Sequence, residues 1–351
     1  MQSFNLPLFL DIGDNNIKDL MLKLDKEFRD IKSKKIVIFT SQGIYKTFKT
    51  LIDELINPYR EVSIYFIKDS SYDVAVNIAK NLAINNVDIV IGFGGGRILD
   101  MAKYASYVSK KKYVAIPTTL SNDGLASPIS VLKTFEGRAK SFGCKSPDGI
   151  IIDIEIIKNT PITLLMAGIG DTVSNYTSLY DWKIESKHKN VPTNDFAYLL
   201  SDTALNMLLF SREEHIRSEY FIKQLAQSLV LSGLAMDIAG NSRPCSGSEH
   251  LFSHSLDENF NINIPHGLKV ALGTITSCIF QKRTYYPIIT FLNRYSIDIS
   301  PNKLGISKEV FIDAWIKAQN TRPDRFTILN TIELNKPYLE KIYNEIMEVL
   351  K

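Results

Sequence analysis

The stretch GFGGGRILDMAK (residues 92–103) decides the fold, because it joins a glycine-rich turn to a helical sequence. The run VDIVIGF (87–93) predicts a buried strand, and Arg97 onward predicts a helix. Backbone N–H groups at a helix N-terminus bind anions, and glycines let a diphosphate approach them closely. The spacing differs from G-x-G-x-x-G, since Arg97 stands where that motif needs glycine. The stretch therefore indicates a dinucleotide-binding turn, with a purely structural strand-to-helix turn as the alternative.

The first half of the chain alternates apolar, strand-like runs with amphipathic segments. Apolar side chains recur at helical spacing between residues 16 and 31. Strands buried on both faces are predicted at residues 34–41, 61–68, 87–93 and 112–119. This alternation predicts an α/β domain with a mostly parallel, doubly wound sheet over residues 1–157.

Long helical patterns replace the strand signals from about residue 158, which predicts an all-α domain over residues 158–351. Thr160-Pro161 is a typical helix start, since Thr caps helices and Pro is tolerated at the first helical position. A chain of 351 residues suits two domains, at roughly 150 residues per domain. The sequence shows no Pro/Gly/Ser linker, so we expect the two domains to share a tight cleft.

The composition is that of a globular protein acting on small molecules. A net charge of +3 is too small to indicate nucleic acid or an anionic membrane as a partner. The three dispersed cysteines form no C-x-x-C pair, which argues against a disulfide framework and a thiolate zinc site. No uncharged run approaches the roughly 18 residues of a membrane span. We expect a cytoplasmic protein without membrane insertion. The sequence contains no pattern that bears on its oligomeric state, so a homo-oligomer is possible.

Three of the five histidines fall within 17 residues: His250, His254 and His266. His250 and His254 share one face if their segment is helical, and Ser246 or Ser248 would cap that helix. Imidazole suits Zn, Fe and Ni, and a catalytic metal needs only three protein ligands. The cluster therefore indicates a catalytic metal site. For His254, a histidine satisfied by a hydrogen bond in the core is the alternative.

Six segments, in this order, resemble the sn-glycerol-1-phosphate dehydrogenase family, within the superfamily of iron-containing alcohol dehydrogenases, glycerol dehydrogenases and dehydroquinate synthases. They are GFGGGRILDMAK (92–103), IPTTLSNDGLASP (116–128), AGIGDTVSN (167–175), GSEHLFSH (247–254), PHG (265–267) and TRPDRFTIL (321–329). The resemblance implies a dehydroquinate synthase-like architecture. It also implies reversible hydride transfer between a nicotinamide and the central carbon of dihydroxyacetone phosphate or sn-glycerol 1-phosphate. One departure is Asn122, which stands where this branch usually has histidine.

The resemblance further implies which residues form the site. One divalent metal, zinc with nickel or iron as alternatives, is bound by Asp171, His250 and His266. The substrate contacts Asp123, Asp171 and His254, of which Asp123 and His254 are also the catalytic candidates. Apart from the resemblance, the basic residue Lys145, close after Arg138 and Lys140, is a further substrate-binding candidate. NAD or NADP contacts Gly94, Gly95, Gly96, Asp100, Thr118, Thr119 and Ser121. The choice between NAD and NADP stays open, because Thr40, Ser41 and Gln42 stand where an acid would bind the ribose 2′-hydroxyl.

Blander interpretations of the same residues remain. Asp171 alone is typical of a helix cap, and Asn122-Asp123-Gly124 is typical of a turn. Arg138, Lys140 and Lys145 suit a solvated hairpin edge as well as a phosphate. The alternatives for the whole chain are a glycerol or other polyol dehydrogenase and a catalytically inactive nucleotide-binding homologue. The complete ligand set argues against the last.

Overall fold

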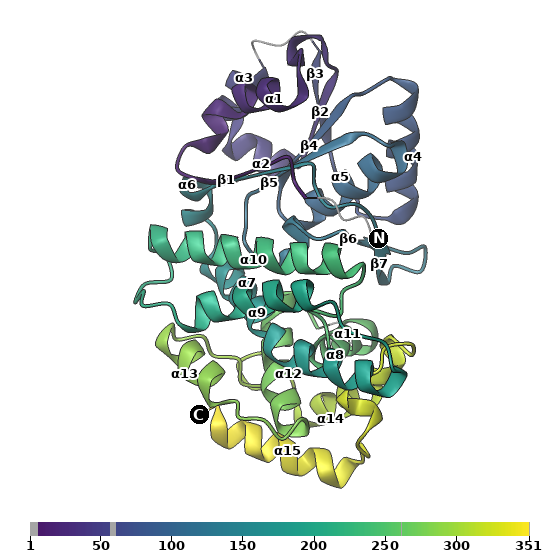
Figure 1. Ribbon diagram of the computed structural model, residues 1–351, viewed down its shortest axis with the longest axis vertical. Helices are drawn as coiled ribbons and strands as arrows, with labels where there is room; N and C mark the ends of the chain where they lie inside the picture. The colour runs from purple at the N-terminus through teal and green to yellow at the C-terminus, as the bar shows by residue number, and fades with distance from the viewer. Residues whose placement is uncertain (1–5, 57–60, 261, 351) are drawn as a thin grey trace. The chain divides into compact units, whose positions relative to one another are not determined.

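The computed structural model describes residues 6–56, 61–260 and 262–350. Its chain divides into two compact units. The first comprises the chain up to residue 120 together with 124–160, and the second comprises 121–123 together with the chain from 161 onward. Figure 1 labels most of their helices and strands, coloured from purple at the N-terminus to yellow at the C-terminus.

The first unit is built on a six-stranded sheet in the order β1-β8-β5-β4-β2-β3, and every pairing in it is parallel. The strands are β1 (Phe9–Gly13), β2 (Ile36–Thr40), β3 (Val62–Phe66), β4 (Ile89–Gly94), β5 (Lys112–Pro117) and β8 (Gly149–Asp153). The predicted parallel sheet is confirmed, and its four predicted strands are β2 to β5. The prediction missed β1 and β8, the pair at one end of the sheet.

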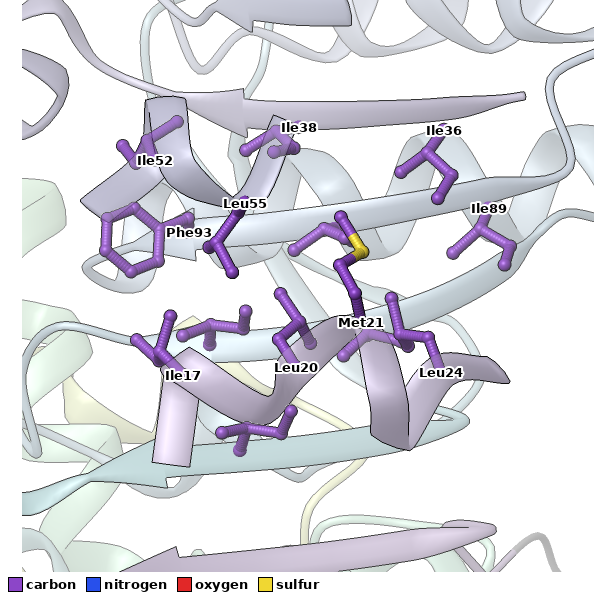
Figure 2. Close-up of a cluster of buried hydrophobic side chains, with 14 of the residues drawn as sticks. Ile17, Leu20, Met21, Leu24, Ile36, Ile38, Ile52, Leu55, Ile89 and Phe93 are labelled. Atoms are coloured by element: carbon purple, nitrogen blue, oxygen red, sulfur yellow. The ribbon is translucent and has the colours of Figure 1, made fainter. Parts of the chain in front are cut away.

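Helices of the first unit cover the sheet with apolar side chains. They are α1 (Leu20–Phe28), α2 (Gln42–Thr47), α3 (Lys49–Ile56), α4 (Tyr72–Ile84), α5 (Gly96–Ser109) and α6 (Ile154–Lys158). The helix expected over residues 16–31 is shorter, because residues 16–19 form a 3-10 turn before α1. Figure 2 shows Leu20, Met21 and Leu24 packed against side chains of β2 and β4, among them Ile36 and Ile89. A separate antiparallel hairpin joins β6 (Ile129–Lys133) to β7 (Ala139–Gly143).

The second unit is helical, as predicted. Its helices are α7 (Ile162–Val173), α8 (Asn175–Lys189), α9 (Asp195–Leu209), α10 (Glu219–Ala239), α11 (Ser248–Phe260), α12 (His266–Phe280), α13 (Tyr286–Arg294), α14 (Lys308–Ala318) and α15 (Lys336–Val349). The innermost is α12, which is buried continuously from Gly267 to Cys278. Thr160 does not cap α7, because its hydroxyl donates to Ile157 O (2.9 Å) and Pro161 occupies the N-cap position. Among the described residues, no helix has the length and apolar character needed to cross a membrane.

Helices α7 and α12 touch at two glycines. A β-carbon on Gly170 would lie 2.1 Å from the carbonyl oxygen of Gly267, and one on Gly267 would lie 1.8 Å from that of Ala167. Both positions are therefore closed to any side chain. The neighbouring residues are Asp171 on α7 and His266 on α12, so this contact brings an acid and an imidazole together.

We expect Gly170→Ala to lower the free energy of unfolding by about 1–3 kcal/mol, because the helices must separate to admit the methyl group. The expected sign is opposite to that of an unconstrained helix, where Gly→Ala stabilises by up to ~1 kcal/mol. Gly43→Ala is the matched control, since Gly43 also lies in a helix and its β-carbon would meet nothing within 4 Å. Urea unfolding measures both variants, and a Gly170→Ala protein as stable as the unmodified chain would contradict the close contact.

Candidate metal and cofactor sites

Three side chains from three helices form the candidate metal site. Ligand atoms of Asp171 (α7), His250 (α11) and His266 (α12) all lie within 4.8 Å of one another. Asp171 Oδ1 is 3.6 Å from His250 Nε2 and 3.8 Å from His266 Nε2. Ligands of a tetrahedral ion at ~2.1 Å lie roughly 3.4 Å apart, so a small contraction would bring these atoms around one cation.

The remaining polar atoms of these side chains already have partners. His250 Nδ1 lies 2.9 Å from Glu249 Oε1, and His266 Nδ1 lies 3.1 Å from Ser253 Oγ. Asp171 Oδ2 accepts a hydrogen bond from the Asp123 backbone N–H at 2.9 Å. Histidines that bind metals ordinarily donate their second N–H in this way. Two Nε2 atoms and one carboxylate oxygen are thereby left pointing at a common centre, which fits a divalent ion.

The pKa values in the site follow from burial and mutual contacts. Burial alone would lower the pKa of His250, but hydrogen bonds with Asp171 and Glu249 raise it to about 9. Burial and the charge of His250 lower the pKa of His266 to about 3. Burial opposes ionisation of Asp171, yet its contacts with His250 and His266 hold its pKa below the ordinary value. Asp171 and His266 thus have the protonation states that a metal needs, while a metal must displace the His250 proton.

His254 lies beside the three ligands without joining them. It is half-buried on α11, and its ring centroid is 6.3 Å from that of His250 and 6.0 Å from that of His266. Burial, then the positive charges of Arg322 and His250, lower the pKa of His254 well below the ordinary value. A neutral imidazole next to a cation site is suited to hydrogen-bond a substrate hydroxyl.

Asp123 and the start of α11 are positioned by neighbouring carboxylates. The N–H of Asp123 donates to Asp171, and the Asp123 side chain is half-buried. The expected serine caps of α11 are wrong. Ser248 Oγ donates to Ser277 Oγ (2.8 Å), and Ser246 Oγ accepts from the Arg325 guanidinium (2.7 Å). The carboxylate of Asp181 on α8 instead accepts the Ser248 N–H at 2.7 Å.

The glycine turn lies at the carboxyl end of β4, as expected for a nucleotide site in a parallel sheet. Gly94 pairs with Pro117 of β5, and its carbonyl accepts from the Thr118 N–H at 3.0 Å. A β-carbon on Gly95 would lie 3.6 Å from Thr119 Oγ1. Helix α5 begins at Gly96. The structure therefore brings Gly94, Gly95 and Gly96 together with Thr118 and Thr119.

The structure gives weaker support for ligand contacts by three other predicted site residues, Asp100, Ser121 and Lys145. Burial raises the pKa of Asp100 to about 6, against the opposing effects of Lys103 and a hydrogen bond with Val131 N–H, so this carboxyl faces the hairpin that begins at residue 129. Ser121 is half-buried. Lys145 Nζ lies 2.7 Å from Asp148 Oδ1 in an ion pair. Their proposed cofactor and substrate contacts stay predictions.

Sequence reasoning missed Glu249, which adjoins His250, and the glycines that let α7 meet α12. Arg325 lies in the segment TRPDRFTIL (321–329), but the sequence alone indicated no role for it. Arg325 donates to Ser246 O and Ser242 Oγ (both 2.6 Å), so it holds the chain that leads into α11. The signal for Glu249 was an acid directly beside a candidate ligand, although only the tertiary contacts identify its partner.

Comparison with known proteins finds relatives of this chain. Residues 13–161 match the iron-containing alcohol dehydrogenase family. The chain is 40% identical over 274 residues to glycerol-1-phosphate dehydrogenase [NAD(P)+] of Methanococcus aeolicus, covering 74% of this chain and 78% of the relative. It is 30% identical over 343 residues to the enzyme of that name from Hyperthermus butylicus, covering 97% of each.

Solved structures share the fold. Glycerol dehydrogenase from Schizosaccharomyces pombe superposes with a TM-score of 0.80 at 19% identity, covering 99% of this chain and 91% of that one. A sulfoacetaldehyde reductase from Bifidobacterium kashiwanohense, in complex with NAD+, superposes with a TM-score of 0.72 at 15% identity, covering 99% and 98%. These identities establish the architecture alone, whereas the sequence relatives establish the family. The chain belongs to the glycerol-1-phosphate dehydrogenase family.

Proposed function

We propose that this protein is a metal-dependent, NAD(P)-linked oxidoreductase that interconverts dihydroxyacetone phosphate and sn-glycerol 1-phosphate. The observation that carries the proposal is the set of Asp171, His250 and His266, whose free ligand atoms converge while their other polar atoms are already bonded. The alternative, a dehydrogenase of unphosphorylated polyols, has weaker support. The chain is 19% identical to the glycerol dehydrogenase of Schizosaccharomyces pombe, but 40% identical to the glycerol-1-phosphate dehydrogenase of Methanococcus aeolicus.

In this proposal Asp171, His250 and His266 hold one divalent ion, zinc with nickel or iron as alternatives. When bound, the ion supplies Lewis acidity to the oxygen on the central carbon of the substrate. His254 hydrogen-bonds a substrate hydroxyl with its neutral imidazole, and the Asp123 carboxylate orients the other end of the polyol. The Asp123 N–H keeps Asp171 Oδ2 engaged, so that the carboxylate presents only Oδ1.

The cofactor contacts are proposed for the first unit. Backbone N–H groups at the start of α5 bind the diphosphate, with Gly94, Gly95 and Gly96 as the close approach and Asp100 one turn further along the helix. Thr118 and Thr119 follow the neighbouring strand β5, and Ser121, which belongs to the second unit, is a further candidate contact. Bound NAD or NADP supplies the hydride acceptor or donor. The three cysteines are free, in keeping with the proposed cytoplasmic location.

Positive charge near His254 supports a phosphorylated substrate. Burial is the main reason that the pKa of His254 is lowered, and the positive charges of Arg322 and Arg325 act in the same direction, so a positive potential acts where the substrate hydroxyls are proposed to bind. Such a potential favours an anionic ligand over a neutral polyol. Lys145 is a second phosphate candidate, which would have to share its charge with Asp148.

We expect His266→Ala to lose bound metal and turnover together, because Asp171 and His250 alone hold a divalent ion poorly. His254→Ala is the matched control, since it removes a neighbouring imidazole that lies outside the ligand set, and it should keep its metal while losing activity. Metal analysis of both purified variants decides. If His266→Ala keeps a full equivalent and His254→Ala does not, the ligand assignment is wrong.

We expect Gly95→Val to abolish cofactor binding while the fold survives. The backbone at Gly95 is extended (φ −79°) and its β-carbon would make only ordinary contact, so the added bulk meets the diphosphate rather than the protein. Gly143→Val, at a position with nothing within 4 Å of the β-carbon, is the control. Calorimetric titration with NADH and NADPH reports affinity, and circular dichroism reports folding. Normal binding by a folded Gly95→Val protein would show that the turn is structural.

We expect dihydroxyacetone phosphate to exceed dihydroxyacetone by at least about tenfold in kcat/KM, since one charged contact worth about 1.4 kcal/mol gives that ratio. The reduction product should be the sn-1 enantiomer, because a fixed cofactor delivers hydride to one face only. Steady-state kinetics with both ketones and a chiral assay of the product test the two statements. Equal rates would indicate a polyol dehydrogenase, and sn-3 product would contradict the proposed reaction.

A further inference from the structure

Glu249 is a fully buried carboxylate directly beside a proposed metal ligand. Its side chain has no solvent exposure. Burial of an ionised carboxylate is costly unless hydrogen bonds and opposite charge compensate. The hydrogen-bond partners of the Glu249 carboxylate must therefore compensate for its burial.

Three donors converge on the two oxygens of Glu249. Oε1 accepts from the Gly247 N–H at 2.5 Å and lies 2.9 Å from His250 Nδ1, while Oε2 accepts from the Thr177 hydroxyl at 2.8 Å. An ionised carboxylate only accepts hydrogen bonds, so His250 Nδ1 must carry a proton. Neutral His250 is then the Nδ1–H tautomer, whose lone pair lies on Nε2, the atom 3.6 Å from Asp171 Oδ1.

The position of Glu249 is fixed independently of the imidazole. Thr177 belongs to α8, so the carboxylate is tied to another helix. Its main chain is held by α12, where a β-carbon on Gly273 would lie 2.7 Å from Glu249 O. A carboxylate anchored on two sides gives the ring of His250 a rigid reference point.

We propose that Glu249 is a positioning residue of the metal site, which selects the tautomer and ring orientation of His250 so that Nε2 faces the ion. It touches neither substrate nor metal, and its effect passes through His250. The proposal rests on the metal ligands of the proposed function. Outer hydrogen bonds of this kind typically change metal affinity by about 10- to 100-fold.

The test compares how tightly zinc binds to three metal-free proteins: the unmodified protein, Glu249→Gln and Thr177→Val. Glu249→Gln keeps the size of the side chain but removes its charge and acceptor-only character, and we expect zinc to bind roughly 10- to 100-fold more weakly. Thr177→Val is the matched control, because it removes a partner of Glu249 and leaves the contact with His250 in place. It should lower the melting temperature while zinc affinity stays close to that of the unmodified chain. Affinity is measured by competition with a chromogenic chelator, and folding by circular dichroism.

A second measurement needs no variant. In ¹⁵N-histidine spectra of the zinc-loaded unmodified protein, His250 should show a protonated Nδ1 and a metal-bound Nε2. Unchanged zinc affinity in Glu249→Gln, or zinc on His250 Nδ1, would overturn the role of Glu249 while leaving the dehydrogenase activity standing. An unmodified protein that binds no zinc, nickel or iron and reduces no dihydroxyacetone phosphate would instead overturn the proposed function, and the role of Glu249 with it.

Discussion

The contact between α7 and α12 at Gly170 and Gly267 is the constraint on which the candidate metal site depends. Backbone meets backbone there, so the helices approach more closely than any side chain allows. Asp171 is the residue after Gly170, and His266 is the residue before Gly267, so the same close approach brings these two side chains together. Helix α11 then needs to supply only one more candidate ligand, His250. The candidate site is thus a product of helix packing, which brings together Asp171 and His266 from positions 95 residues apart in the sequence.

Buried polar groups around the site fix the orientation of the three side chains that this packing brings together. Glu249 and Ser253 engage the Nδ1 atoms of the two imidazoles, and the Asp123 N–H engages one oxygen of Asp171. Asp181 secures the start of α11, and burial together with the charge of Glu249 raises the pKa of Asp181 to about 6. Two carboxylates near each other in the interior cost stability.

Sequence patterns predicted most of the strands whose residues are mainly apolar and buried. The central strands β2, β4 and β5 are buried almost throughout, whereas β1 carries Asp11 and lies at one edge of the sheet, so its pattern is weak. The strand β3, expected to be buried on both faces, lies at the opposite edge and exposes Ser63 and Tyr65. The spacing of His250 and His254 indicated a metal site, but selecting Asp171 required resemblance to a family. Glu249 was beyond prediction, because its partner Thr177 lies 72 residues away and is brought near only by the packing of α8 on α11.

An anomalous difference map from crystals of the zinc-loaded protein would test the proposed ligand set most directly. We expect one strong peak about 2.0–2.2 Å from His250 Nε2, His266 Nε2 and an oxygen of Asp171, with His254 outside the coordination shell. A peak bound by His254 in place of any of these residues, or by His250 through Nδ1, would contradict it.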